Sequence, residues 1–111
     1  MKAGDIVLID LIQADGFFKL RPALLLKQFP KYNDFLVCGI SAQVNQFLKG
    51  YDHILLVEEA HFKSTGLRKT SLIRLFFLAV VQHQRIGGTI GHIPEQLHKD
   101  LLSRLSKFIV S

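Results

Sequence analysis

Residues 21–26 read Arg-Pro-Ala-Leu-Leu-Leu, and this block decides the fold. Proline is tolerated at the first residue of a strand, and the apolar run that follows is typical of a short buried strand. Further apolar runs lie on either side of it, at residues 5–11, 35–40, 53–57, 71–81 and 86–93. The run at 71–81 is long for one strand, so we expect it to be bent or broken. Short strands at such intervals indicate a small β-barrel or sandwich.

The last segment of the chain has the pattern of a helix. Pro94 suits a first helical position, and Glu95 follows in the first turn, where acidic side chains are favoured. The apolar residues expected on one helix face are Leu97, Leu101, Leu102, Leu105, Phe108 and Ile109. The residues expected to face away are His98, Lys99, Arg104 and Lys107. With a weaker helix or turn at 41–48, the expected fold class is mainly β (α+β), a small β-barrel closed by a C-terminal α-helix.

Composition excludes several classes of protein. The chain has 111 residues, of which 49% are apolar, and this predicts a single domain over residues 1–111 rather than disorder. One cysteine, Cys38, excludes an internal disulfide and is expected to be buried as a small hydrophobic residue. The longest apolar run is far shorter than the roughly 20 residues of a membrane-spanning helix, and the start lacks the apolar region of a signal peptide. We therefore expect a soluble, cytoplasmic protein without a membrane partner, whose apolar surplus is covered by a partner subunit.

The positive charge of the chain is localised. The formal net charge is +5, and residues 62–94 contain five Lys or Arg and no Asp or Glu, while the rest of the chain carries nine of each sign. A localised positive excess favours an anionic partner, with nucleic acid first and a membrane surface second.

A set of short motifs occurs in a characteristic order along the whole chain. They are Gly4-Asp5-Ile6-Val7-Leu8-Ile9-Asp10-Leu11, the block at 21–26, Cys38-Gly39-Ile40-Ser41-Ala42-Gln43, Gly66-Leu67 with Ser71-Leu72-Ile73-Arg74-Leu75, and Ile90-Gly91-His92-Ile93 before the last helix. This order resembles that of the PemK/MazF family of type II toxins.

The resemblance implies a fold, an activity and partners. The fold is an SH3-like (CcdB/PemK-like) barrel with a C-terminal helix, usually found as a homodimer. The activity is sequence-specific, metal-independent endoribonuclease cleavage of single-stranded RNA, which inhibits growth and proceeds by attack of the ribose 2′-OH on the neighbouring phosphate. The implied partner is a cognate antitoxin, which restrains the toxin and forms a DNA-binding complex with it; we expect it to carry an acidic, extended segment that covers a basic groove.

The resemblance also implies catalytic residues. In the family, the Arg of the first block and the Ser or Thr of the second carry catalysis, which here are Arg21 and Ser41, and Arg74 occupies the place of an assisting basic residue. A guanidinium is planar and always protonated, so it suits the growing charge on a phosphoryl group. Without the resemblance, the favoured interpretations are that Arg21 is an exposed Arg before a proline and that Ser41 is a helix N-cap. Arg74 interrupts an apolar run, so it must reach water, an acid or a phosphate.

Further residues are candidates for RNA binding. Lys19, Gln43, Arg68 and Lys69 are polar or basic and lie near the motifs. Phe17 and Phe18 are unusual in a loop; they either stack on bases or contact another protein, and the protein contact is slightly favoured.

Two departures from the family leave an alternative open. The first loop, residues 12–20, is short, and Phe76 stands where some members have an acid. His61 and His83 are candidates for a general base by residue type alone. No spacing indicates a metal site, so we expect neither metal nor cofactor. The alternative is a non-catalytic RNA-binding module, or a CcdB-like toxin that inhibits a protein target, on the same fold.

Overall fold

The computed structural model describes the chain except residues 13–15 and 17, with the backbone alone at 11, 12 and 18. Within the described residues, one antiparallel sheet has the order β4-β5-β3-β2-β1-β6. Its strands are β1 (Asp5–Ile12), β2 (Phe18–Gln28), β3 (Phe35–Ser41), β4 (His53–Leu55), β5 (Ser71–Val81) and β6 (Ile86–His92). Three 3-10 turns are described, η1 (Val44–Gln46), η2 (Phe62–Thr65) and η3 (His83–Arg85), and the chain ends in helix α1 (Glu95–Val110).

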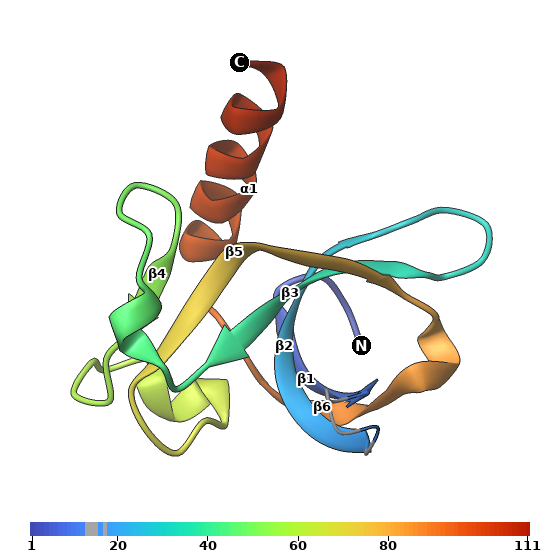
Figure 1. Cartoon of the computed structure of the whole chain (residues 1–111), viewed down its shortest axis with the longest axis horizontal. Helices are drawn as coiled ribbons and strands as arrows, with labels where there is room; N and C mark the ends of the chain where they lie inside the picture. The colour runs from blue at the N-terminus through green and yellow to red at the C-terminus, as the bar shows by residue number, and fades with distance from the viewer. Residues whose placement is uncertain (13–15, 17) are drawn as a thin grey trace.

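Figure 1 shows the strands curling round on themselves, with α1 standing on one side of the sheet beside β4. The expected fold class, mainly β with a C-terminal helix, is confirmed. The strand predicted at 22–26 extends further at both ends, the one predicted at 53–57 is shorter, and the segment 41–48 contains only the η1 turn.

Strands β1, β2 and β3 bury side chains on both faces of the sheet. One face carries Ile6, Leu24 and Cys38 against the helix residues Leu101 and Leu105. The opposite face has a second cluster, formed by Val7, Ile9, Ala23, Leu25, Phe35 and Val37. Strands buried on both faces read as continuous apolar runs instead of alternating ones. This explains why the sequence has such runs in β1, β2 and β3.

The side chains of helix α1 are buried or exposed as predicted at some positions only. Leu101 and Leu105 are buried as predicted, but Phe108 and Ile109 are 49% and 67% exposed, because the last turns project beyond the sheet. Two residues expected to face away in fact form hydrogen bonds with backbone carbonyls elsewhere in the chain. His98 Nε2 donates to the Leu26 carbonyl (2.8 Å), and Arg104 donates to the carbonyls of residues 51 and 52 (both 3.2 Å).

Strand β5 is bent, as its length predicted. Cys38 pairs with Leu78 while the next residue, Gly39, pairs with Arg74, so residues 75–77 form a bulge with no partner on β3. The three bulge residues go to three places. Leu75 enters the main core, Phe76 packs against Tyr51 and Phe108 (centroids 4.7 and 4.5 Å apart), and Phe77 stays exposed.

A buried carboxylate holds the bulge. Asp52 Oδ1 accepts the Leu75 N–H (3.0 Å), which the bulge takes out of the strand ladder, and Oδ2 accepts the Leu48 N–H (2.9 Å). Bulges leave backbone groups unpaired, and a buried unpaired N–H is costly. The carboxylate of Asp52 therefore accepts the N–H group that the bulge leaves without a partner in the sheet, and this hydrogen bond makes the bulge possible.

The η2 turn brings the two edges of the sheet together. It follows the edge strand β4 in sequence and packs against the other edge strand, β6, backbone to backbone. A Cβ on Gly66 would overlap the Ile90 carbonyl, and a Cβ on Gly91 would overlap the carbonyl of Thr65. Gly66 also ends η2 with φ +74°, a conformation that favours glycine. The glycines of two motifs distant in sequence thus close the barrel.

Cys38 is fully buried, as expected, and burial raises the pKa of its thiol to about 12. Among the described residues, no helix is long and apolar enough to cross a membrane.

We predict that Gly91→Ala destabilises the fold by about 2–3 kcal/mol, because the new methyl group forces η2 away from β6. Urea denaturation measures the change. Gly87→Ala on the same strand is the control, since its Cβ would lie 3.3 Å from the nearest atom, the Leu8 carbonyl oxygen. Equal urea midpoints for the two variants would show that the η2–β6 contact does not close the barrel.

Candidate active site

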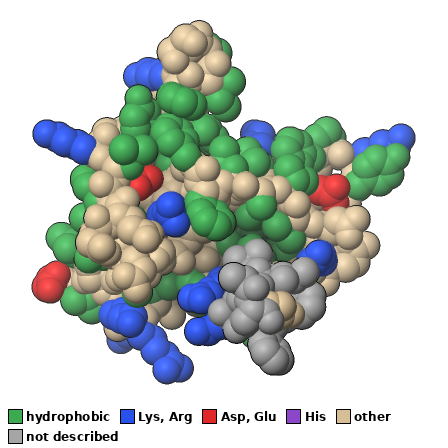
Figure 2. All heavy atoms as spheres, in the orientation of Figure 1, with side chains coloured by type: hydrophobic (Ala, Val, Ile, Leu, Met, Phe, Trp, Pro, Cys, Tyr) green, Lys and Arg blue, Asp and Glu red, His purple; other side chains and the backbone are tan. Residues whose placement is uncertain are grey.

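A cleft of about 640 Å³ opens where β2, β3 and β5 meet the loop before β5. Its lining includes six of the nine residues that the sequence singled out: Arg21, Ser41, Gln43, Arg68, Lys69 and Arg74. The described lining residues include four cations and no Asp, Glu or His. Figure 2 shows Lys and Arg side chains at several places on the face that it draws, some among the hydrophobic side chains of its upper part and others below them. The cleft is therefore a cationic site suited to an anionic ligand.

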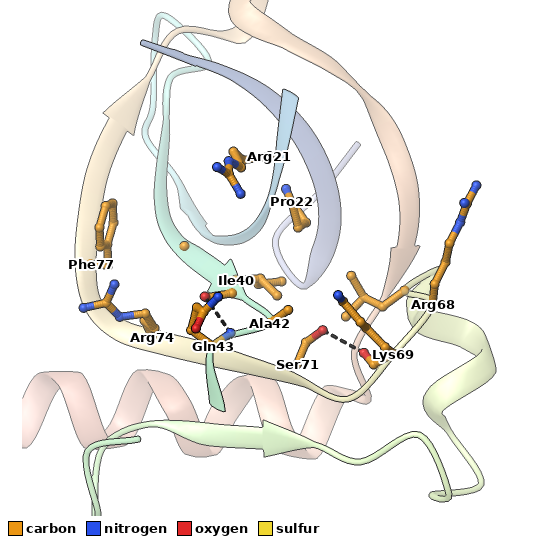
Figure 3. A pocket seen from close by; sticks show the side chains of 13 residues that line it. Arg21, Pro22, Ile40, Ala42, Gln43, Arg68, Lys69, Ser71, Arg74 and Phe77 are labelled. Atoms are coloured by element: carbon orange, nitrogen blue, oxygen red, sulfur yellow. Dashed lines mark hydrogen bonds between the residues drawn. The ribbon is translucent and has the colours of Figure 1, made fainter. Parts of the chain in front are cut away.

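Arg21 lies inside β2 and pairs with Ile9 of β1. The sequence had placed it just before the strand, which was predicted to begin at Pro22. Its side chain is exposed and reaches into the cleft (Figure 3). Position 22 pairs with Leu8, so the proline stands inside the strand and not at its first residue. A strand residue carries its side chain on a rigid backbone, which suits a group that must hold a phosphoryl oxygen in place.

Ser41 is the last residue of β3 and is half-buried. Its Oγ accepts the backbone N–H of Gln43 (3.0 Å), closing a turn two residues long. The helix N-cap alternative is wrong: η1 begins later, and its N-cap is Gln43, which makes no side-chain cap bond. Because Ser41 Oγ serves as an acceptor in this turn, its own O–H proton is free to be donated to a ligand.

Arg74 and Phe77 come from β5 at one end of the cleft. Arg74 is half-buried, and its guanidinium carbon lies 5.0 Å from the centroid of the Phe77 ring. Gly39 lies beside that ring, since a Cβ there would be 3.3 Å from Phe77 Cδ2. A cation over an aromatic face is attracted by the negative potential of the ring. The ring thereby holds the guanidinium, which forms no ion pair with any of the acids that the structure describes.

Arg68 and Lys69 come from the loop between η2 and β5, at the other end of the cleft (Figure 3). Both side chains are exposed. The loop is tied down at both sides: Thr65 Oγ1 accepts the Leu67 N–H (3.1 Å), and Ser71 Oγ donates to the Lys69 carbonyl (2.8 Å). These hydrogen bonds fix the backbone of the loop from which the side chains of Arg68 and Lys69 extend.

Other predicted residues are not brought into the cleft. Lys19 is exposed on β2 and is not among the lining residues. Phe17 lies outside the described residues, as does the side chain of Phe18. Phe76, which stands in place of an acid, packs against the helix instead.

Neither histidine considered as a general base lines the cleft. His61 Nε2 pairs with Glu59 Oε2 (2.9 Å), and His83 is exposed in η3. The backbone N–H of Leu56 and then His61 lower the pKa of the Glu59 carboxyl. Among the residues that the structure describes, no group of three His, Cys, Asp or Glu is placed to hold a metal ion.

Seven of the lining residues were not candidates from the sequence, among them Phe77 and Ser71. In the sequence, Phe77 lies within an apolar run predicted to be a strand. It lines the cleft because of the bulge, which the sequence did not reveal. Ser71 opens β5 and carried no signal beyond its place in a motif.

Comparison with known families agrees with this architecture. Residues 2–109 match the model of the family described as PemK-like, MazF-like toxin of type II toxin-antitoxin system. The chain belongs to this family. Membership in a toxin–antitoxin family implies an antitoxin partner for this PemK-like toxin. None of the curated proteins compared with it matches significantly.

Solved structures show the same fold. The Mycobacterium tuberculosis toxin MazF-mt6 superposes with a TM-score of 0.68 at 18% sequence identity, covering 93% of each chain. At this identity the likeness concerns the fold of the PemK-like toxin.

We predict that Asp52→Asn destabilises the toxin by about 1–3 kcal/mol, because the amide NH2 group replaces one of the two accepting oxygens and leaves one N–H donor unsatisfied. Chemical denaturation measures this. Asp100→Asn is the control: its ion pair with Arg104 is half-exposed, so its loss costs below about 1 kcal/mol. Equal losses in the two variants would show that Asp52 does not hold the bulge.

Proposed function

We propose that this toxin is a sequence-specific, metal-independent endoribonuclease that cleaves single-stranded RNA. The observation that carries the proposal is the convergence of Arg21, Arg74, Arg68 and Lys69 with the Ser41 hydroxyl on one cleft whose described lining has no acid. Guanidinium and ammonium groups track a phosphate backbone, and a hydroxyl donates to a phosphate oxygen. Family membership supports the same activity.

The chemistry follows from these groups. The ribose O2′ attacks the neighbouring phosphorus, the new O2′–P bond forms and the P–O5′ bond breaks. The products are a 2′,3′-cyclic phosphate and a 5′-hydroxyl, and the proton lost by O2′ balances the one gained by O5′. Arg21 and Arg74 stabilise the charge that grows on the nonbridging oxygens, and Ser41 donates its O–H to one of them. Arg68 and Lys69 hold flanking phosphates.

A second function is favoured by one observation. No described lining residue is an imidazole or carboxylate that removes the O2′ proton. A toxin that binds RNA without cutting it, or a CcdB-like toxin that inhibits a protein target, needs no such base. Cleavage of RNA by the purified protein separates the two.

Exposed apolar side chains support a homodimer. They lie at the far end of β5, where Leu78 and Val80 are exposed, and at the end of α1, with Phe108, Ile109 and Val110. Covering them with a second copy stabilises the assembly. We propose that the dimer acts in the cytoplasm and that the antitoxin, which forms a DNA-binding complex with it, covers the cationic cleft with an acidic segment.

We predict that Arg21→Ala lowers kcat/KM for RNA cleavage by about 100- to 1,000-fold, because one donor to the transition state is lost. The assay uses single-stranded RNA in buffer containing EDTA. Arg85→Ala is the matched control, since Arg85 is exposed in η3 and does not line the cleft. Equal cleavage by wild type and Arg21→Ala contradicts the site. Wild-type protein that binds RNA without cutting it supports the second function.

We predict that the pH profile of kcat/KM has no inflection between about pH 6 and 7, where an imidazole titrates. Arginine stays protonated throughout this range, and the described lining has no histidine. Single-turnover cleavage over the range from about pH 5.5 to 9 measures the profile. An inflection that disappears in His61→Gln or His83→Gln would assign that histidine as the general base.

A further inference from the structure

Phe77 is an aromatic side chain left uncovered in a cationic cleft. It is 52% exposed, although its neighbour Phe76 packs into a cluster with Tyr51 and Phe108. Exposing an aromatic ring forgoes a large gain from burial. The bulge that sends Leu75 and Phe76 inward therefore leaves Phe77 outward, on the wall of the cleft.

The Phe77 ring is held in place before any ligand arrives. The Arg74 guanidinium lies over it at 5.0 Å, and Gly39 of β3 leaves it room to lie close to the neighbouring strand. The bulge itself is fixed by the Asp52–Leu75 hydrogen bond. A ring ordered in advance loses little conformational entropy when a second planar group stacks on it.

We propose that Phe77 is a stacking platform for one nucleobase of single-stranded RNA, with the phosphate of that nucleotide beside Arg74. Single-stranded nucleic acids are bound by cationic grooves that follow the backbone combined with aromatic rings that stack on bases. Both parts occur here on one wall. The proposal rests on the proposed function for its substrate class, and it assigns a base-binding subsite at the β5 end of the cleft.

The arrangement of the cleft gives the subsite a place along the strand. In Figure 3, Arg74 and Phe77 lie at one end, Arg68 and Lys69 at the other, and Arg21 between them. A backbone that runs along these cations passes Arg21 in the middle. The base on Phe77 is then next to the phosphate that Arg21 holds, so stacking on Phe77 positions that phosphate.

A second copy of the chain is the competing occupant of this ring. Leu78 and Val80 follow on the same strand and are also exposed, but neither lines the cleft. Phe77 differs from them because it lines a cleft that also holds four cations, which disfavour an apolar partner surface and favour a polyanion. RNA is therefore the occupant that the charges select.

The test uses Phe77→Trp, because the natural chain contains no tryptophan and the introduced indole is a reporter without background. The probes are 2′-O-methyl RNA oligonucleotides of each base, which lack the attacking hydroxyl, and inorganic polyphosphate, which has charge but no bases. We expect the RNA to quench the fluorescence of the introduced indole and polyphosphate to bind without quenching. Phe29→Trp is the control, since Phe29 is exposed outside the cleft.

The second measurement is affinity. We expect Phe77→Leu to weaken RNA binding, measured by fluorescence anisotropy, by roughly 5- to 150-fold, with the salt dependence unchanged because the phosphate contacts remain. Phe29→Leu is the control, since Phe29 is exposed outside the cleft, and it binds as wild type does. Phe77→Leu should keep its unfolding temperature and its oligomeric state.

Each contrary outcome points to a different failure. Bound RNA that leaves the indole of Phe77→Trp unquenched, or Phe77→Leu that binds as tightly as wild type, overturns the stacking proposal. Phe77→Leu that changes the oligomeric state assigns the ring to contact between copies and also overturns it. Quenching in Phe77→Trp without cleavage of unmodified RNA by the wild type leaves the subsite standing and refutes the cleavage. Cleavage by the wild type without quenching in Phe77→Trp refutes the subsite alone.

Discussion

The hydrogen bond from the Leu75 N–H to Asp52 is the interaction on which the rest of the structure depends. It lets β5 leave the ladder of β3 for three residues and rejoin it further along. The core, the helix contact and the cleft each receive one side chain from that interruption. A regular strand would place alternate residues on two faces only. The bulge breaks this alternation, and Phe77 lines the cleft together with Arg74.

A second constraint acts at the opposite end of the cleft and does not involve β5. The close approach of Gly66 and Gly91 seats η2 on the edge strand β6, and the loop carrying Arg68 and Lys69 leaves from that contact. The two ends of the cleft are thus positioned by separate parts of the chain. Between them, Arg21 stands on β2, where it pairs with Ile9 of β1 two residues before the pairing of β2 with β3 begins.

The strands could be predicted from the sequence because they are short continuous apolar runs bounded by turn residues, and the helix because its apolar residues recur at helical spacing. The convergence of Arg21, Ser41 and Arg74 could be predicted only through the order of motifs, since they lie on three strands. The bulge could not be predicted, because a register shift is a property of two paired strands and residues 71–81 read as one apolar run. In the sequence, Asp52 lies just before a predicted strand and has no special pattern around it. Its side chain accepts backbone N–H groups of Leu48 and Leu75, and a pattern of side chains cannot reveal such hydrogen bonds.

The net charge of +5 acquires a physical meaning from this geometry. Two cations from the acid-poor segment 62–94 stand at one end of the cleft and a third at the other, while Arg21 joins them from a part of the chain with balanced charge. Like charges gathered in one cleft repel, and the fold tolerates this because three of the four side chains remain exposed to water and its ions. A polyanion that enters the cleft removes the repulsion and stabilises the folded state in proportion to its occupancy. The cations of the cleft therefore lie outside the core, and the described lining residues include no acid that would neutralise them. A phosphate backbone requires this arrangement for binding.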